Sequence, residues 1–466
     1  MMARPTPLSG FPELLPAARN AELAVIDQLR KTFELHGYAN IETRVAEPLD
    51  RLVKGGEIDK EVYVMRRLRA AEDADVGDTD STDVGDADSI DVGRADLGLH
   101  FDLTVPFARY VLENAGVLEF PFRRYQIQKA WRGERPQEGR FREFTQADVD
   151  VVMKDELPFH FEVEVARVMA DALSRLPLPP LRMRVNNRKL IQGFYRGIGC
   201  DDPTPVIRIV DKLDKLPADT VRELLESDAG LSSEQAARCL DLATISSSDT
   251  SFVDRVRALG AQHELLDVGL EELAAVMEAS TSFRGERFSV HADLSLARGL
   301  DYYTGTVFEL HMEGYEFLKA VGGGGRYDAL ASDGRTTYPG VGISFGISRS
   351  LVPLISRGVL TSTRSVPSAV LVALPDEQSR GRCDEIAQRL RERDIAVEVA
   401  ASAQKYGRQI RYAERRGIPY VWFPGTDGGP DQVKDIRSGD QIDADPGQWN
   451  PPAEDLRPRV IVKEQQ

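Results

Sequence analysis

Two arginines on either side of a short loop are candidates for binding phosphate or carboxylate groups. Arg132 and Arg140 flank a loop that contains Pro136 and Gly139, between two stretches with strand-like composition. A planar guanidinium group donates hydrogen bonds in a geometry that matches carboxylate and phosphate oxygens. A salt-bridged surface hairpin would carry the same charges, so this cluster alone leaves both interpretations open.

The stretch after this loop carries a row of polar side chains. Gln146, Asp148 and Asp150 are spaced two residues apart, and side chains at that spacing share one face of a strand. We therefore expect a row of hydrogen-bond acceptors beside the arginine pair.

A second cluster combines Arg298 with two adjacent tyrosines. Tyr302 and Tyr303 lie in a stretch that reads as a strand, so they are expected to point to opposite faces. At least one of them is then placed to enter a pocket, although ordinary aromatic packing would produce the same pattern.

Two glycine-rich stretches complete the set. The four glycines at 322–325 permit either a close backbone approach or a turn, and no Gly-Lys-Ser/Thr follows them, which excludes a phosphate-binding P-loop. The glycine spacing in residues 340–349 does not fit the dinucleotide fingerprint, which argues against a dehydrogenase. The 340–349 stretch instead predicts a strand that leads into a helix. Arg349 would lie near the start of that helix, a suitable position for binding a phosphate.

The elements that position these residues follow from hydrophobic periodicity. Leu23, Ile26, Leu29 and Phe33 recur at helical spacing, and Gly37 follows as a stop. Three strands are expected after this helix, at residues 38–45, 61–68 and 99–105.

The second half of the chain changes character twice. Residues 185–285 are mostly helical and read as an inserted module. Residues 366–466 alternate strand and helix, which predicts a small α/β domain with parallel strand pairing.

Bulk composition indicates a soluble globular protein of two to four domains. Of 466 residues, 42% are hydrophobic and 29% are charged, and no apolar run is long enough to span a membrane. Residues 1–10 contain no apolar signal core. Cys200, Cys239 and Cys383 are odd in number and far apart, so we expect a reducing compartment, the cytoplasm, and no disulfide framework.

The net charge of -16 is concentrated in one segment. Residues 72–91 hold nine acidic residues and no Lys or Arg, so the rest of the chain carries only about -7. An Asp-Val-Gly triplet recurs there every eight residues, at Asp75, Asp83 and Asp91. A calcium site is one interpretation; a low-complexity insert that cannot bury enough apolar surface to fold is the favoured one.

Deleting residues 72–94 with a short Gly/Ser bridge is therefore expected to leave the protein's function nearly intact. Closure entropy grows only with the logarithm of loop length, so the shorter loop changes little. Steady-state kinetics of the deletion variant check this. A loss above about tenfold, roughly 1.4 kcal/mol, would show that the repeat has a function.

Together the four clusters resemble a known enzyme family. Residues 132–150 are similar to motif 2 of class II aminoacyl-tRNA synthetases, and residues 340–349 to motif 3. Residues 298–304 and 323–328 resemble the two histidine-specific motifs of histidyl-tRNA synthetases. Asp102 and the residues after it, 103–110, match the same family, and the resemblance runs from Pro7 to about Arg437.

This resemblance implies a two-domain enzyme. Its catalytic domain, residues 1–357, would be α+β, built on an antiparallel sheet, with the acidic insert at 72–94 and a helical insertion at about 185–285. A linker at 358–367 would lead to an α/β anticodon-binding domain at 368–466. The implied protein is a cytoplasmic homodimer that activates histidine with ATP and Mg²⁺, transfers it to tRNA(His), and has no metal site of its own.

The resemblance also implies roles for individual residues. Asp102, Thr104 and Gln146 would hold the α-amino group of histidine, and Asp150, Tyr303 and Tyr327 would contact the imidazole, with Tyr302 in the same pocket. Arg132 would clamp the carboxylate and the α-phosphate, Glu134 would face the adenine edge, Phe144 would stack on the adenine, and Arg140 and Arg349 would hold the outer phosphates. Arg298 would stabilise the α-phosphate in the transition state.

A basic helix in the C-terminal domain fits tRNA binding. Lys405, Arg408 and Arg411 crowd it, together with Arg415 and Arg416, and residues 433–439, which include Arg437, resemble the family's anticodon-binding strand and turn. We expect Lys405, Arg408, Arg411 and Arg437 to contact tRNA. A solvated helix face would show the same charges.

Three positions depart from the family pattern, and two alternatives stay open. Arg44 replaces a proline of motif 1, His100-Phe101 replaces an Arg-led pair before Asp102, and Ser348 replaces an acidic residue beside Arg349. The first alternative is a regulatory paralogue, the regulatory subunit of ATP phosphoribosyltransferase, which would bind histidine but charge no tRNA and would lack the anticodon-binding domain. The second, a generic nucleotide-binding α/β enzyme, leaves the tyrosine pair unexplained.

Overall fold

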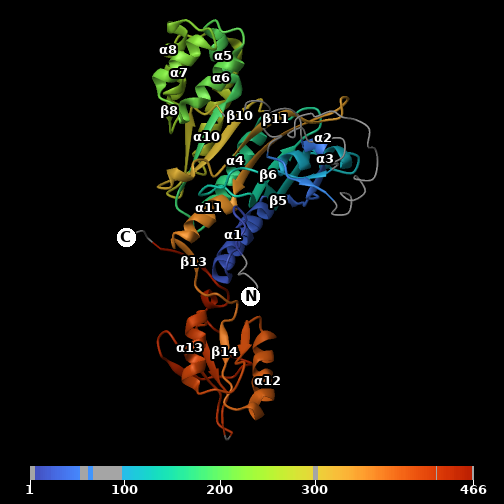
Figure 1. The fold of residues 1–466 in the computed structure, drawn as a ribbon, viewed down its shortest axis with the longest axis vertical. Helices are drawn as coiled ribbons and strands as arrows, with labels where there is room; N and C mark the ends of the chain where they lie inside the picture. The colour runs from blue at the N-terminus through green and yellow to red at the C-terminus, as the bar shows by residue number, and fades with distance from the viewer. Residues whose placement is uncertain (1–5, 53–60, 67–96, 298–302, 427, 464–466) are drawn as a thin grey trace, which may run out of the picture. The chain divides into compact units, whose positions relative to one another are not determined.

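The computed structural model describes residues 6–52, 61–66, 97–297, 303–426 and 428–463, which fall into two compact units (Figure 1). The first unit contains the described parts of Met1–Pro12 and Gln28–Val352, and the second contains Glu13–Asp27 and the described part of Pro353–Gln466. Helix α1 (Pro16–Leu35) contributes to both units and confirms the predicted N-terminal helix.

A nine-stranded sheet forms the centre of the first unit, in the order β1-β5-β6-β12-β11-β10-β7-β9-β8. The strands are β1 (Ala39–Asn40), β5 (Phe122–Trp131), β6 (Glu143–Val152), β7 (Leu181–Asn187), β8 (Ser246–Ser247), β9 (Phe288–Asp293), β10 (Thr306–Met312), β11 (Gly322–Ser332) and β12 (Thr337–Gly346). All neighbours pair antiparallel except β1 with β5 and β7 with β9. The predicted antiparallel catalytic sheet is confirmed.

Strand β6 runs through the interior of this unit. It lies between β5 and β12, and helix α4 (His160–Ser174) packs against both β6 and β12. Its last eight residues are all buried. Polar side chains on β6 are therefore removed from water and need partners inside the protein.

The first unit also contains a three-stranded sheet in the order β2-β4-β3, with β2 (Ala46–Pro48), β4 (Leu97–Leu99) and β3 (Val64–Met65). Helix α2 (Leu49–Leu52) follows β2. The predicted strand over 38–45 is reduced to β1, and the strand predicted over 99–105 is wrong beyond Leu99.

Helix α3 (Thr104–Asn114) begins inside that predicted strand. Pro106 in the first turn suits a helix start because its missing N–H would have no partner there. The Asp102 carboxylate accepts a hydrogen bond from the Val105 N–H at 3.1 Å, which satisfies one of the free donors of the first turn.

The helical module gathers at one end of the unit in Figure 1. Its helices are α5 (Arg188–Gly197), α6 (Pro203–Val210), α7 (Ala218–Ser227), α8 (Ser233–Ala243), α9 (Phe252–Ala258) and α10 (Glu264–Ser280), with the 3₁₀ turn η4 (Asp211–Asp214). Helices α5 and α10 cross closely at a glycine, since a Cβ at Gly269 would lie 2.1 Å from the backbone nitrogen of Leu190. The 3₁₀ turn η5 (Glu316–Leu318) lies between β10 and β11, and α11 (Ile347–Ser356) follows β12 as predicted. The first unit ends within α11, at Val352.

The second unit contains a five-stranded sheet in the order β15-β14-β16-β17-β18. Its elements are β14 (Val370–Val372), η6 (Glu377–Ser379), α12 (Arg380–Arg391), β15 (Val397–Val399), α13 (Tyr406–Arg416), β16 (Tyr420–Phe423), β17 (Gln432–Asp435), β18 (Gln441–Asp443) and η7 (Ala453–Asp455). Strand β14 pairs parallel with β15 and β16, which confirms the predicted alternation of strand and helix.

The segment predicted as a linker at 358–367 is partly a strand. Within it, β13 (Leu360–Ser362) pairs antiparallel with β19 (Val460–Val462) near the C-terminus. A partner so distant in sequence leaves no local signal, which explains why composition alone indicated only an irregular connection.

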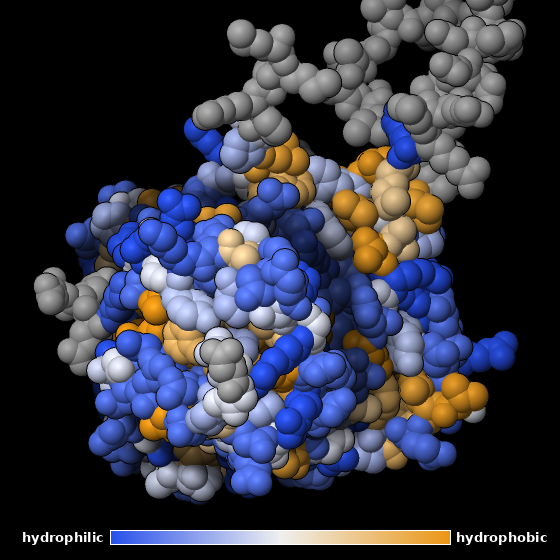
Figure 2. Space-filling model, turned by 90° about the horizontal axis from the view of Figure 1, so that it is seen from below, coloured by the Kyte–Doolittle hydropathy of each residue, from blue (hydrophilic) through white to orange (hydrophobic). Residues whose placement is uncertain are grey.

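Hydrophobic side chains lie mainly inside the two units. In the second unit a buried core surrounds Leu371, Ala387 and Trp422, and the face shown in Figure 2 is mostly hydrophilic with scattered apolar groups. Cys200, Cys239 and Cys383 are buried and free. None of the helices in the described ranges is long and apolar enough to cross a membrane.

Candidate active site

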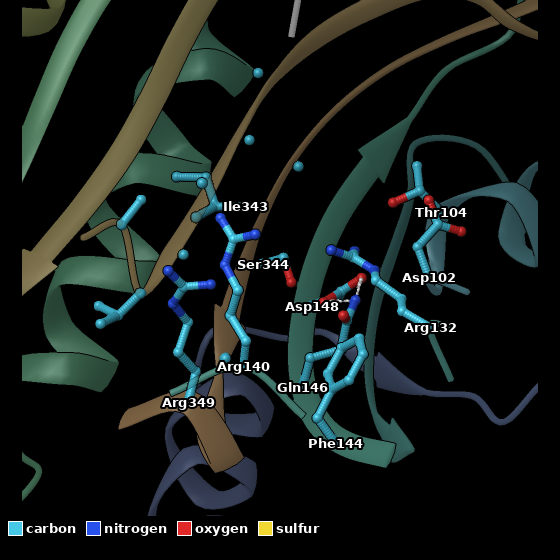
Figure 3. Close-up of a pocket in the computed structure, with 18 of the residues that line it drawn as sticks. Asp102, Thr104, Arg132, Arg140, Phe144, Gln146, Asp148, Ile343, Ser344 and Arg349 are labelled. Carbon is cyan, nitrogen blue, oxygen red and sulfur yellow. Dashed lines mark hydrogen bonds between the residues drawn. The ribbon is translucent and has the colours of Figure 1, made fainter. Parts of the chain in front are cut away.

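A cavity of about 390 Å³ opens in the first unit between β6, β11, β12 and the loop after β5 (Figure 3). It brings together all the described residues that the sequence assigned to histidine or ATP. These are Asp102, Thr104, Arg132, Glu134, Arg140, Phe144, Gln146, Asp150, Tyr303, Tyr327 and Arg349. Arg298 and Tyr302 lie outside the described residues, and Tyr303 precedes β10 instead of lying in a strand as predicted.

At one end of the cavity, Asp150 is held by two partners. The Tyr327 hydroxyl donates to its Oδ1 at 2.8 Å, and an Arg124 guanidinium nitrogen lies 2.8 Å from its Oδ2. Burial raises the pKa of the Asp150 carboxyl, while the Arg124 charge and the Tyr327 hydrogen bond oppose the rise. Each carboxylate oxygen retains a second lone pair with which it can accept a hydrogen bond from a ligand.

Arg124 is a site residue that sequence reasoning missed. Its side chain is completely buried, and its guanidinium lies 4.2 Å from the centre of the Phe107 ring. The available signal was the hairpin register, because Arg124 on β5 directly opposes Asp150 on β6. Since an unpaired buried charge is costly, these two residues depend on each other.

Asp148 is a second carboxylate that was not assigned a role. It lines the cavity together with Gln146 and Asp150, as the two-residue spacing predicted. The Gln146 amide donates to both of its oxygens, at 3.0 and 3.1 Å, as Figure 3 shows. Burial raises the pKa of Asp148 to about 7, opposed by Arg124, whose nearest nitrogen is 3.9 Å away.

Asp102 and Arg132 form the adjoining wall of the cavity. Burial raises the pKa of Asp102, and the hydrogen bond from Val105 and the charge of Arg132 oppose the rise. Arg132 donates from its Nε to the carbonyl oxygen of Phe101 at 3.0 Å, and its guanidinium lies 5.2 Å from the centre of the Phe144 ring. This arrangement fixes the arginine beside the aromatic ring.

The opposite side of the cavity is cationic. Arg349 donates to the carbonyl oxygen of Leu318 at 2.6 and 3.2 Å, and Arg140 pairs with Glu134 at 3.1 Å. Figure 3 shows Arg140 and Arg349 on the same side, across from Asp102. A cavity with carboxylates at one end and arginines at the other suits a ligand pair that has a cationic group and several phosphates.

Glycines in β12 make room for the acidic end. A Cβ at Gly342 would lie 2.0 Å from Oδ1 of Asp150, and a Cβ at Gly340 would lie 2.5 Å from the Tyr327 ring. For glycines 322–325, which lie in β11, a Cβ at Gly324 would lie 1.9 Å from the carbonyl oxygen of Gly342, so of the two interpretations of that stretch the structure supports close approach and not a turn.

Two protein-family models match this chain. Residues 86–349 match the family model for histidyl-tRNA synthetase, and residues 368–442 match that for an anticodon-binding domain. The chain belongs to the histidyl-tRNA synthetase family. An aminoacyl-tRNA ligase is the enzyme class that the sequence predicted, and it is confirmed.

Individual relatives of this synthetase cover nearly its whole length. The histidine–tRNA ligase of Cutibacterium acnes is 55% identical, with 99% of each chain covered. That of Micrococcus luteus is also 55% identical, with 98% of this chain and 99% of the relative covered. The crystal structure of histidyl-tRNA synthetase from Nostoc sp. PCC 7120 superposes with a TM-score of 0.81 at 29% identity, covering 95% of this chain and 97% of the other. The regulatory-paralogue alternative is not favoured.

Each residue at the three departures from the synthetase pattern has a polar partner in the structure. Arg44 lies 3.4 Å from both Glu47 and Glu113. His100 is buried, with its Nε2 2.7 Å from the carbonyl oxygen of Lys129. The Ser348 hydroxyl accepts from the backbone N–H of Thr145 at 2.8 Å, which ties α11 to the start of β6.

The basic residues of the anticodon-binding domain fall into two groups. Arg408 and Arg411 on α13, together with Arg415, line a hollow of about 370 Å³, and Lys405 precedes the helix. Arg437 lies apart from this hollow. It donates to Asp435 and Asp455 at 2.7–3.0 Å and to the Tyr420 hydroxyl at 3.0 Å.

Proposed function

We propose that this chain activates histidine with ATP and transfers the histidyl group to tRNA(His). The observation that carries the proposal is the cavity that joins a buried Asp150–Arg124 pair to a set of arginines in a chain of this family. A carboxylate oxygen of histidine attacks the α-phosphorus of ATP in line, and the bond to the β-phosphate breaks to release pyrophosphate. A ribose hydroxyl of the terminal tRNA adenosine then loses its proton and attacks the adenylate carbonyl, which releases AMP.

The carboxylate end of the cavity is proposed to bind the amino acid. Asp102, Thr104 and Gln146 accept hydrogen bonds from the α-ammonium group. Asp150 accepts from one imidazole nitrogen, and Tyr303 and Tyr327, together with Tyr302, enclose the ring. Site groups that pair with ring nitrogens discriminate strongly, because a ligand without those nitrogens leaves them unpaired.

The arginine side is proposed to bind ATP, which enters as its Mg²⁺ complex. Arg132 bridges the amino-acid carboxylate and the α-phosphate, Phe144 stacks on the adenine, and Glu134 faces the adenine edge. Arg140 and Arg349 hold the outer phosphates, and Arg298 neutralises charge on the α-phosphate as it develops. Arg132 and Arg298 are the proposed catalytic residues, since attack by a carboxylate needs positioning and charge neutralisation more than a strong base.

The remaining proposals concern assembly and domains. We propose a cytoplasmic homodimer whose catalytic domain covers residues 1–357, with inserts at 72–94 and about 185–285, and whose anticodon-binding domain covers residues 368–466. Lys405, Arg408 and Arg411 are proposed to contact tRNA. Arg437 was assigned the same role, but two carboxylates already neutralise it, so we propose that it mainly anchors β17 to η7.

Amino-acid-dependent exchange of pyrophosphate into ATP tests the proposed activation. The purified full chain is expected to support exchange with histidine and with none of the other standard amino acids. Exchange with a different amino acid, or none with a folded protein, would refute the proposal.

Replacing both Arg408 and Arg411 with glutamate is expected to lower kcat/KM for tRNA charging by at least about tenfold, because phosphate contacts dominate affinity. Pyrophosphate exchange should be unchanged. Arg389→Glu on α12, a charge reversal at another exposed arginine of the same domain, is the control and should leave charging within about twofold. Equal charging losses in the control and in the double variant would refute the assignment to α13.

A further inference from the structure

Gln146 and Asp148 form a buried couple at the centre of the cavity. Gln146 and Asp148 are 6% and 2% exposed, and both line the cavity. The amide nitrogen of Gln146 lies 3.0 and 3.1 Å from the two Asp148 oxygens. An ionised carboxylate only accepts hydrogen bonds, so it determines which end of the amide faces it.

The opposite end of that amide is thereby directed away from Asp148. A glutamine amide has a donor and an acceptor end that exchange positions when χ3 turns by half a circle. With its nitrogen committed to Asp148, Gln146 presents Oε1 to a ligand. An α-ammonium group donates only, so it requires this orientation and is repelled by the reverse one.

We propose that Asp148 is a positioning residue for the amino-acid substrate, which acts by holding the Gln146 amide with its oxygen toward the α-ammonium group. This inference rests on the proposed function, in which Gln146 contacts that group. Asp148 is not a catalytic residue in this account, since it acts through its neighbour.

Some groups around Asp148 favour its ionised form and others disfavour it. Arg124 on β5 approaches to 3.9 Å, and Ser344 on β12 also donates a hydrogen bond to the carboxylate. Asp150 on the same strand and Asp102 before α3 add negative charge. Burial, with the negative charges of Asp150 and Asp102, raises the pKa of Asp148 to about 7 against the opposing effects of Arg124 and Ser344, so the carboxylate can change its protonation state near neutrality.

Protonation of Asp148 would reverse the preferred orientation of the Gln146 amide. A protonated Asp148 can donate to the amide oxygen, which turns the Gln146 nitrogen toward the ligand. The α-ammonium group favours the ionised carboxylate, so the histidine KM should rise as pH falls through about 7. Asp148→Asn removes this titration, so its KM should vary less over the same range. The imidazole of free histidine titrates identically in both assays and cancels in the comparison.

Kinetics of pyrophosphate exchange test the proposal. Asp148→Leu is expected to raise the histidine KM by about 10- to 100-fold, with the ATP KM unchanged. In a Gln146→Leu background the same change should add less than about twofold, because the residue through which Asp148 acts is already lost. If the two effects multiply, or if Asp148→Leu leaves the histidine KM unchanged, the proposal is overturned.

Substrate analogues separate orientation from a general collapse of the cavity. Histidinol keeps the α-ammonium group, and imidazolepropionate lacks it. Asp148→Leu should weaken inhibition by histidinol but leave that by imidazolepropionate within about twofold. Equal weakening of both would overturn the proposal in favour of a structural role. Asp455→Asn, a buried carboxylate of the other unit, controls for loss of a buried charge and should change neither.

Two further results keep the test decisive. If Asp148→Leu does not fold, the pH profile of Asp148→Asn carries the test, and a profile identical to that of the unmodified enzyme overturns the proposal. A wild-type enzyme that lacks histidine-dependent exchange would instead refute the proposed function, which distinguishes the two failures.

Discussion

Asp150→Ala is expected to raise the histidine KM in pyrophosphate exchange by about 100-fold, roughly 2.7 kcal/mol, while sparing the ATP KM. The substitution removes the acceptor proposed for an imidazole nitrogen. It also removes the partner of the Tyr327 hydroxyl and of the Arg124 guanidinium, both 2.8 Å away. Since Arg124 is completely buried and would keep only the more distant Asp148, 3.9 Å away, as an anionic partner, the protein should also lose stability, by up to about 3–5 kcal/mol.

Two companion variants separate lost recognition from lost stability. Asp150→Asn keeps an acceptor oxygen and should raise the histidine KM less than alanine does. Asp150→Ala combined with Arg124→Leu removes both charges, so its thermal unfolding temperature should recover while its histidine KM stays high. Normal histidine dependence in the double variant would show that Asp150 does not contact the ring.

Arg132→Ala is expected to lower kcat of adenylate formation by about 10³-fold, roughly 4 kcal/mol. The guanidinium lies beside the Phe144 ring and lines the cavity, where we propose that the α-phosphate binds and gains charge during attack. An interaction made mainly in the transition state should lower kcat and kcat/KM by similar factors. Arg132→Lys restores charge but not the planar pair of donors, so only partial recovery is expected.

Single-turnover measurement of adenylate formation checks this prediction. Arg182→Ala provides the control, because Arg182 is a half-exposed arginine of the same unit that pairs with Glu313 on the surface. Its rate should match that of the unmodified enzyme. If Arg132→Ala changes only the KM for ATP, the arginine contributes uniform binding and is not catalytic.

Sequence patterns within a few residues predicted those elements of the fold whose structure depends on near neighbours in the chain. The β5–β6 hairpin follows from strand composition around a Pro/Gly loop, and the passage from β12 to α11 follows from glycines that end in a helix-forming segment. The predicted positions of Gln146 and Asp150 on one face held because the two-residue period is a property of any strand.

Features that depend on distant partners could not be predicted in this way. Arg124 becomes a site residue only through its register with Asp150 and its complete burial. The hydrogen bond from Val105 to Asp102 belongs to a helix start, where a β-strand had been expected. Tyr303 lies before β10, because that strand begins only at Thr306.

Transfer of histidine to tRNA(His) is the most direct test of the proposed function. Purified full-length chain, ATP, Mg²⁺ and radiolabelled histidine are mixed with a tRNA(His) transcript, and acid-precipitable histidine is measured with time. Our account predicts stoichiometric charging of tRNA(His) and none of a transcript for another amino acid. A protein that binds histidine and ATP but charges no tRNA would contradict the account and support a regulatory role.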